Sequence, residues 1–340
     1  MLKMTSTILK IEPLGSPWKT IDPFLICAYH VDNYPSGNED LGPDTTHPNS
    51  SMDGDSGGTA NWSMYYGRTV PGFPAHPHRG FETITILRKG VVDHADSMGN
   101  SARYAAGDVQ WLTAGRGINH SEMFPLLNRE APNPLELFQI WLNLPARSKM
   151  VTPNFKMLWA ENIPLHQIQD KIGCVEIRCI VGSPGEEFPQ SPPTPPNDSW
   201  ASAPNSDLAI WTIKLSPHAK WTLPPASGSG TRRQLFYFMG EAMLMAGQQV
   251  DALTSVEVSC DEPMELINGS EVSELLMLQG RPIGELVVQD GPFVMNSTDG
   301  ISQAYEDYRQ TQFGGWRWPS KDPVHDRDSS RFESSKYARV

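Results

Sequence analysis

The chain has 340 residues, a formal net charge of −12 and a sequence pI near 5.2. This acidic balance argues against a broad basic surface for nucleic-acid phosphates or anionic membranes. The length is sufficient for two domains with separate cores. The four cysteines lack a CxxC pair, and no signal-peptide pattern opens the sequence. We therefore expect an intracellular, reduced protein that contacts neither nucleic acid nor membrane directly.

Turn-forming residues and short β-branched runs dominate the chain. The 30 prolines and 28 glycines favour an all-β body over a helical bundle or a βαβ fold. An early buried strand is predicted in DPFLICAYHV, followed by a long polar loop over about residues 37–59. Helices should be few.

Residues 65–145 contain a regular series of predicted strands. TITIL, VVDHA, DVQWLTA and LELFQIWLNLP are divided by the turn signals KG, DSMGN and GRG. This pattern predicts a compact antiparallel barrel or sandwich. The proline and charges of NLPARSKM then indicate a linker near residue 148. We expect domains over 1–148 and 149–320, followed by a polar, solvated tail over 321–340.

The second half repeats the pattern without its HxH pair. Strands are predicted in IGCVEIRCIVG, AIWTIKL, QLFYFMG, AMLMAG, VEVSC and LLMLQG, and the proline-rich loop 188–207 should lack regular structure. The rough symmetry suggests two related β units. A helix is predicted over 302–313, with one face formed by Ile301, Tyr305, Tyr308 and Gln312.

Two short motifs carry candidate metal ligands. His76 and His78 are two residues apart in HPHRGFETITIL, as are His120 and Glu122 in GRGINHSEMF. Side chains two apart on a strand share a face, so neighbouring strands can aim all four at one point. Three imidazoles and a carboxylate suit a divalent transition metal, and an octahedral ion would keep two positions open. Open coordination positions indicate a catalytic rather than a structural metal site.

Glu82 is a competing carboxylate. It follows His78 by four residues and shares the face of the histidines if the strand is regular. A bulge in RGF would break that relation. Glu82 would then be a hydrogen-bond partner for a ligand or for a bound substrate.

Other residues near the motifs can be interpreted as structural or as functional. Arg79 could orient an anionic or oxygenated substrate or form an outward salt bridge, and Gln139 is expected to be a buried amide satisfied by backbone. His94 is expected at the surface. Several apolar residues could line a pocket but more often form plain core: Phe73, Trp111, Met123 and Phe124.

These motifs resemble the pirin family. The resemblance rests on HPHRGFETITIL, on DSMGN followed by AGDVQWLTAGRGINHSEMF, on FQIWLNLP and on LQGRPIGELVVQDGPFVMNS, and it covers most of residues 17–315. It implies two tandem cupin (jelly-roll-like) β-barrels with a short C-terminal helix, the first barrel holding Fe(II)/Fe(III) and the second structural. The family's iron ligands fall on His76, His78, His120 and Glu122. The chain departs from shorter members in the two long loops and after Trp318.

The resemblance implies two functions of different kinds. One is an iron-dependent dioxygenase that uses O2 on a quercetin-like flavonol or a related small oxygenated aromatic substrate, with Glu122 or Glu82 as base. The other is a redox-sensing transcriptional co-regulator, cytoplasmic or nuclear, that binds a transcription factor or metabolic enzyme. Mn, Co, Ni and Cu also accept such a ligand shell. Two barrels paired within one chain favour a monomer.

Overall fold

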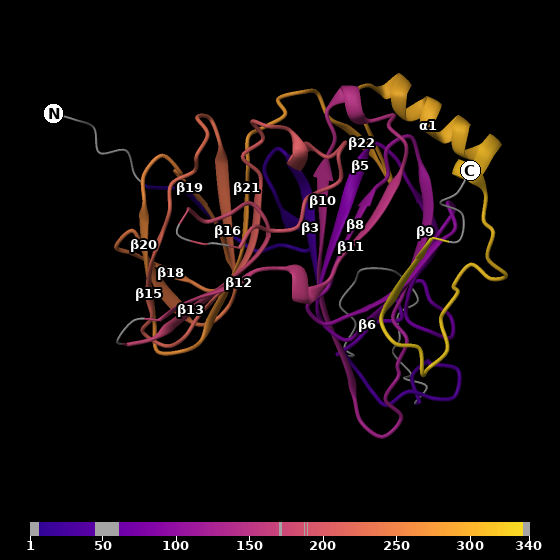
Figure 1. The fold of residues 1–340 in the computed structure, drawn as a ribbon, viewed down its shortest axis with the longest axis horizontal. Coiled ribbons are helices and arrows are strands. Elements are labelled where there is room, and N and C mark those ends of the chain that lie inside the picture. Colours follow the sequence, from indigo (N-terminus) through magenta and orange to yellow (C-terminus); the bar gives the residue numbers. More distant parts are fainter. Residues whose placement is uncertain (1–6, 45–60, 170–171, 187, 189, 336–340) are drawn as a thin grey trace. The chain divides into compact units, whose positions relative to one another are not determined.

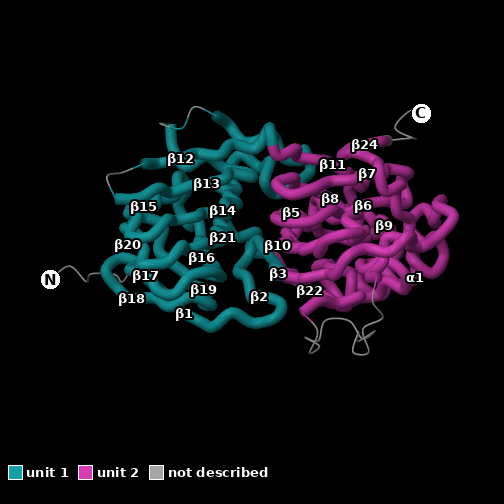
Figure 2. The backbone as a smooth tube through the Cα atoms, turned by 90° about the horizontal axis from the view of Figure 1, so that it is seen from below, with its two compact units in different colours: residues 1–27, 161–284 teal, residues 28–160, 285–340 magenta. Residues whose placement is uncertain are grey.

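The computed structural model describes residues 7–44, 61–169, 172–186, 188 and 190–335. It is mostly β-sheet with one α-helix, as the sequence predicts (Figure 1). Two compact units are present: unit 1 comprises residues 1–27 and 161–284, and unit 2 comprises residues 28–160 and 285–340 (Figure 2). In the part of the chain that is described, no helix is long and apolar enough to cross a membrane.

Unit 1 contains two antiparallel sheets. The seven-stranded sheet has the order β1-β19-β16-β21-β14-β13-β12. Its strands are β1 (Ile8–Pro13), β12 (Leu165–Gln169), β13 (Cys174–Val181), β14 (Ala209–Leu215), β16 (Arg232–Met239), β19 (Thr254–Val258) and β21 (Ser273–Gly280). The four-stranded sheet has the order β15-β20-β17-β18. Its strands are β15 (Lys220–Leu223), β17 (Ala242–Met245), β18 (Gln248–Asp251) and β20 (Met264–Asn268).

The core of unit 1 follows from alternation along its strands. In β13, Val175, Ile177 and Cys179 are buried, whereas Glu176 and Arg178 point to the other face. Apolar residues from both sheets join them in one cluster. Among the described residues of this unit, no group of histidine, cysteine and acidic side chains has the spacing of a metal site. In the described residues of the proline-rich loop, the one helical element is the single turn η3 (Trp200–Ser202).

Unit 2 contains two larger antiparallel sheets and a two-stranded hairpin. The five-stranded sheet has the order β24-β7-β6-β9-β4, and the larger sheet includes β11-β8-β5-β10-β3. The strands of the first are β4 (Gly72–His78), β6 (Val91–Asp96), β7 (Asn100–Ala105), β9 (Ile118–Met123) and β24 (Phe332–Ser335). Those of the second are β3 (Phe24–Tyr34), β5 (Phe81–Lys89), β8 (Val109–Thr113), β10 (Asn133–Asn143) and β11 (Asn154–Leu158). Strand β3 carries the chain from unit 1 into unit 2 and pairs its first residues with β2 (Trp18–Lys19).

The predicted turns lie where the sequence signals place them. DSMGN joins β6 to β7, and Asp96 Oδ1 accepts from the backbone N–H of Met98 and of Asn100. GRG joins β8 to β9, with Gly117 at φ +131. A Cβ at Gly117 would lie 2.5 Å from the ring of Phe313, so only glycine fits that turn.

Helix α1 (Thr298–Thr311) begins four residues before the predicted start. The Ser297 side chain caps it by accepting from the Gly300 N–H. Ile301 and Ala304 are buried, and Tyr305 and Tyr308 pack beside Phe293, so three members of the predicted face are confirmed. The fourth, Gln312, is the exposed residue that follows the helix, in a left-handed conformation. Phe293 comes from the hairpin of β22 (Val288–Asp290) and β23 (Phe293–Met295). The short turns η1 (Ala146–Ser148), η2 (Ala160–Asn162) and η4 (Gln312–Gly314) complete the helical elements.

The two units do not follow head to tail along the sequence. The boundary expected near residue 148 lies close to residues 160–161, where the chain passes from unit 2 to unit 1. However, residues 1–27 cluster with 161–284, and α1, expected with the second barrel, clusters with residues 28–160. An ion pair of 2.7 Å between Arg79 and Asp307 of α1 accounts in part for that placement. Most of the predicted polar loop, residues 45–60, lies outside the described residues.

The expected solvated tail is instead fixed to unit 2 as far as residue 335. We call residues 316–335 the C-terminal strap. The indole of Trp318 donates to the Asp96 carbonyl, and the Ala75 N–H donates to the Lys321 carbonyl at 2.7 Å. Strand β24 then pairs with β7. Composition predicted a solvated tail because the segment is polar, but its backbone carbonyls are satisfied by donors of unit 2.

Arg103 holds the strap from within unit 2. Its side chain is 2% exposed and donates to both carboxylate oxygens of Asp93 at 2.7 Å. Its remaining N–H groups donate to strap carbonyls, including those of His325 at 3.0 Å and Asp326 at 2.7 Å. One buried guanidinium therefore neutralises a buried carboxylate and orders a polar segment.

We predict that Arg103→Met lowers the free energy of unfolding by about 3–5 kcal/mol, because Asp93 would be left buried without its cation. Urea unfolding followed by tryptophan fluorescence measures this. Limited proteolysis should also cut the strap faster in the variant. Arg309→Met is the matched control, since the Arg309 side chain is 69% exposed; a loss below about 1 kcal/mol in Arg103→Met would contradict the assignment.

Lys149 stabilises the turn between β4 and β5 through a hydrogen bond to its backbone. It is 1% exposed, and its Nζ donates to the Gly80 carbonyl and to Asn143 Oδ1, both at 2.8 Å. Burial lowers the pKa of Lys149 to about 8. The buried ammonium costs stability below that pH, since the unfolded chain keeps its ordinary higher pKa.

The stability of the protein relative to Lys149→Met should therefore rise with pH. Between about pH 8 and 10.5 the unfolded state binds more protons at Lys149, so the relative stability increases by about 2–3 kcal/mol across that window. Chemical unfolding of both proteins at pH 7.5, 9 and 10 measures the difference. The exposed Lys220→Met should show none, and a pH-independent difference for Lys149→Met would refute the prediction.

Candidate metal centre

The pairing of β4 with β9 brings the two histidine motifs together. His76 lies directly opposite His120 in this antiparallel register, and His78 lies opposite Ile118. A register shift between Phe73 and His76 marks a bulge just before the HxH motif. The expectation that the two motifs occupy neighbouring strands is correct, and antiparallel pairing supplies the close approach.

Three imidazoles converge at this point. Ligand nitrogens of His76, His78 and His120 all lie within 4.8 Å of one another. The ring centroids are 4.4 Å apart for His76 and His120, 4.8 Å for His76 and His78, and 4.9 Å for His78 and His120. His78 and His120 are 4% and 0% exposed. This is the spacing expected of three side chains that share one ion.

The protonation of the three rings fits metal binding. Burial lowers the pKa of His76 to about 4 and those of His78 and His120 well below the usual value, so all three are neutral near pH 7. His76 Nδ1 lies 2.9 Å from the Pro74 carbonyl, which leaves its Nε2 lone pair free. Within the described residues, neither nitrogen of the buried His120 ring has a hydrogen-bond partner. Buried ring nitrogens without a hydrogen-bond partner are suitable ligands for a divalent transition metal.

Glu122 lies on the same strand as His120 but is held by neighbours. Its Oε2 accepts from the Gln139 amide at 2.7 Å, and its Oε1 accepts from the Thr85 hydroxyl at 3.2 Å. Burial raises the pKa of Glu122. Tyr104 and Gln110 lie at 3.5 Å from Oε1. The structure thus brings three histidines into one group and leaves Glu122 in a hydrogen-bonded network beside it.

Glu82 occupies the other sheet. The strand breaks at Arg79 and Gly80, where Gly80 has φ +86, and Glu82 begins the next strand, β5. The regular strand from His76 to Glu82 is therefore absent, and the bulge that would separate them takes the form of a turn. Glu82 Oε1 accepts from the Trp111 indole at 3.0 Å and the Thr113 hydroxyl at 2.7 Å.

The structure corrects the expectations for His94 and Gln139 and decides between the two roles considered for Arg79. His94, expected at the surface, is 0% exposed and stacks on Phe155, because β6 is covered on both faces. The amide of Gln139 is satisfied by the Glu122 carboxylate rather than by backbone. Arg79 forms the salt bridge with Asp307, but it is only 5% exposed.

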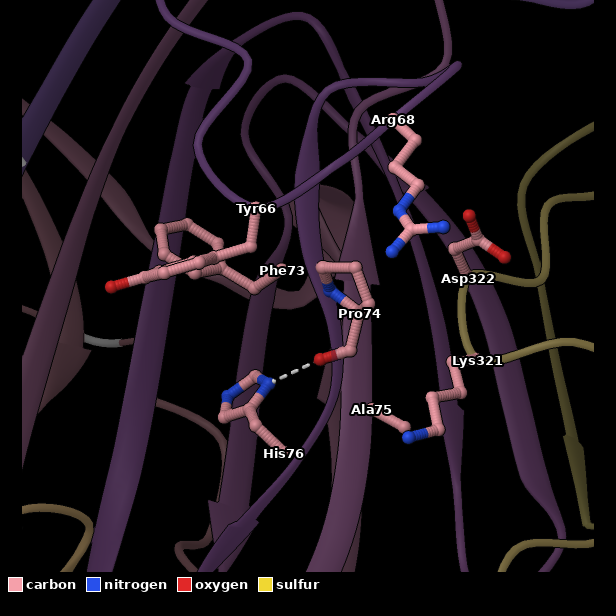
Figure 3. A pocket seen from close by; sticks show the side chains of 8 residues that line it. All are labelled: Tyr66, Arg68, Phe73, Pro74, Ala75, His76, Lys321 and Asp322. Atoms are coloured by element: carbon pink, nitrogen blue, oxygen red, sulfur yellow. Dashed lines mark hydrogen bonds between the residues drawn. The ribbon is translucent and has the colours of Figure 1, made fainter. Parts of the chain in front are cut away.

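A pocket of about 790 Å³ opens beside the histidines (Figure 3). His76 belongs to both the imidazole group and the pocket wall. Of the four apolar residues considered as walls, Phe73 lines the pocket, whereas Met123 and Phe124 belong to core clusters and Trp111 is buried. The sequence gave no signal for the other lining residues, which come from distant segments: Tyr66, Arg68, Pro74, Ala75, Lys321 and Asp322.

The fold and the three-histidine group are those of a cupin protein with a candidate metal site. A family model described as pirin matches residues 44–142, and one described as the pirin C-terminal cupin domain matches residues 210–314. The chain belongs to the pirin family. Its two cupin-type domains agree with the expected two-barrel fold.

Similar proteins agree with this assignment. Pirin-1 of Arabidopsis thaliana is 35% identical over 249 residues, which cover 72% of this chain and 78% of that protein. A Pseudomonas aeruginosa protein provisionally named as a quercetin 2,3-dioxygenase is 35% identical over 245 residues, covering 71% and 79%. The crystal structure of quercetin 2,3-dioxygenase from Acinetobacter baumannii matches with a TM-score of 0.69 and 26% identity, covering 91% of this chain and 98% of that one.

We predict that the chain binds one divalent metal and that His120→Ala reduces binding at least tenfold. Glu122→Gln should weaken binding about 10- to 100-fold, and Glu82→Gln should leave it unchanged because its carboxylate is already held by Trp111 and Thr113. Elemental analysis and competition with a chelator measure both. Equal loss in the two Gln variants would contradict the choice of Glu122 as the fourth ligand.

Proposed function

We propose that the chain is a metal-dependent dioxygenase that acts on a quercetin-like flavonol or a related oxygenated aromatic. The observation that carries the proposal is His76, whose ring belongs at once to the imidazole group and to the wall of the pocket. A substrate in the pocket would therefore reach the metal site directly. The quercetin 2,3-dioxygenase named among the similar structures supports the same reaction class.

The pocket suits a flat aromatic molecule. Phe73 and Tyr66 lie on one wall with ring centroids 5.9 Å apart, and the Tyr66 side chain is exposed. Aromatic faces contribute a large apolar area and stack on a planar ligand. The volume of about 790 Å³ is within the range of small-molecule sites.

The proposed ligands are His76, His78 and His120, with Glu122 as the fourth. The chemistry that a bound divalent metal supplies here is Lewis-acid activation of vicinal substrate oxygens and an electron path to O2. Fe(II)/Fe(III) is the proposed native metal, and Mn, Co, Ni or Cu could occupy the same donors. The neutral imidazoles hold no charge of their own, so the positive charge at the site would come from the ion.

The proposed base that removes the hydroxyl proton of the substrate is the Glu122 carboxylate after it has shifted off the metal, with Glu82 as the alternative. Burial raises the pKa of Glu122, which brings its proton affinity closer to the working pH. Gln139 and Thr85 fix the carboxylate by donating to separate oxygens. Glu82 is less suited to act as the base, because it lies on β5 and its carboxylate accepts hydrogen bonds from Trp111 and Thr113.

Purified protein loaded separately with Fe(II), Mn(II), Co(II), Ni(II) or Cu(II) should consume quercetin and O2 in equal amounts. We expect His76→Ala to lower kcat/KM at least 100-fold, and Glu122→Gln to lower kcat more than Glu82→Gln does. Loss of the flavonol absorbance band and an oxygen electrode follow the reaction. Glu306→Gln is the control, because Glu306 lies on the exposed side of α1.

Metal content is measured on the same samples. Absence of turnover in every form that carries one metal per chain would refute the dioxygenase with this substrate. Equal rates in Glu122→Gln and the parent protein, at full metal content, would refute the role of Glu122 as base.

A further inference from the structure

We propose that Lys321 of the C-terminal strap selects substrates that carry an anionic group, which it binds at the rim of the pocket beside His76. The inference rests on the proposed function in one respect, namely that the substrate occupies this pocket. It adds a substrate class, an oxygenated aromatic with a carboxylate or a similar anion, and a residue that recognises it.

The strap places Lys321 next to the metal site. The Ala75 N–H donates to the Lys321 carbonyl at 2.7 Å, and Ala75 directly precedes His76 in β4. Lys321 and His76 both line the pocket. In Figure 3 the Lys321 side chain turns toward Ala75, on the His76 side of the pocket. The backbone of Lys321 is thus hydrogen-bonded to the residue that directly precedes a proposed metal ligand.

The strap is anchored on both sides of Lys321. Before it, the Trp318 indole donates to the Asp96 carbonyl at 2.8 Å. After it, Asp93 Oδ2 accepts from the His325 N–H, and Arg103 donates to the His325 carbonyl. These anchors lie three and four residues from Lys321. Its backbone is therefore fixed, and only the side chain must be ordered on binding a ligand.

Lys321 has no carboxylate partner among the described residues. It takes part in none of the ion pairs formed by the described residues. The rim also holds Arg68 and Asp322. Arg68 and Asp322 likewise take part in none of those ion pairs, and in Figure 3 both lie on the side of the pocket away from His76. Two cations and one carboxylate give the rim a net positive charge, and Lys321 is the cation on the His76 side in Figure 3.

The strap lies outside the residues that the family models match. The two family models end at residues 142 and 314, so Lys321 lies beyond the part that they match. The strap is held by several contacts, among them the hydrogen bonds of Arg103 and Trp318 and the pairing of β24 with β7.

The test compares two probes of equal shape that differ in charge, 2-naphthoate and its neutral amide, 2-naphthamide. Isothermal titration calorimetry on the metal-loaded full chain gives the ratio of the two dissociation constants. We expect Lys321→Gln to reduce the preference for naphthoate about fivefold relative to the parent protein, the upper range for an exposed ion pair. Lys321→Glu should reduce it further, and 0.5 M NaCl should shrink the effect in the parent protein.

Comparison between parent and variant removes any direct binding of the carboxylate to the metal, since that contribution is common to both. Lys220→Gln, an exposed lysine of unit 1, is the matched charge control and should keep the parent ratio. An unchanged ratio in Lys321→Gln overturns the proposal. A ratio that falls in Arg68→Gln but not in Lys321→Gln also overturns it.

Binding is measured without turnover, so the two proposals fail separately. If no metal form oxidises quercetin but the probe ratio still depends on Lys321, the dioxygenase proposal fails alone. If turnover is present and the ratio is independent of Lys321, the inference about the strap fails alone. Lys321 is exposed, so Lys321→Gln should unfold at the same temperature as the parent protein, which a melting curve verifies.

Discussion

The antiparallel pairing of β4 with β9 is the contact on which the site depends. It sets His76 opposite His120 and carries His78 and Glu122 on the same two strands. Three neutral imidazoles within 4.8 Å can be buried together because none carries a charge to desolvate. The buried unpaired nitrogens of His78 and His120 are a cost that folding alone leaves uncompensated, and coordination to a metal would offset it.

A second constraint is the network that holds Glu122. Donors from strands β5 and β10 of the opposite sheet reach its carboxylate through Thr85 and Gln139. A buried carboxylate without such donors would be strongly destabilising. The network therefore links the two sheets of unit 2 at the metal site, and the same hydrogen bonds that satisfy Glu122 also fix its position beside His120.

The polar end of the chain shows how a solvated composition can still produce order. Arg103 neutralises Asp93 inside unit 2 and uses its remaining donors on strap carbonyls. Buried guanidinium groups suit this role because they have five donors in a fixed plane. By ordering the strap, this arrangement sets Lys321 and Asp322 at the pocket rim and so extends the site with residues more than 200 positions from His76.

The sequence by itself determined the all-β class, the DSMGN and GRG turns, the apolar face of α1 and the two-residue spacing of the histidine motifs. These depend on local periodicity and turn chemistry, which a few neighbouring residues specify. Only the tertiary structure decided that Glu82 lies on another strand, that His94 is buried, that α1 clusters with unit 2 and that the strap lines the pocket. Each depends on contacts between distant segments, such as Arg79 with Asp307 and Ala75 with Lys321, and local patterns carry no information about such partners.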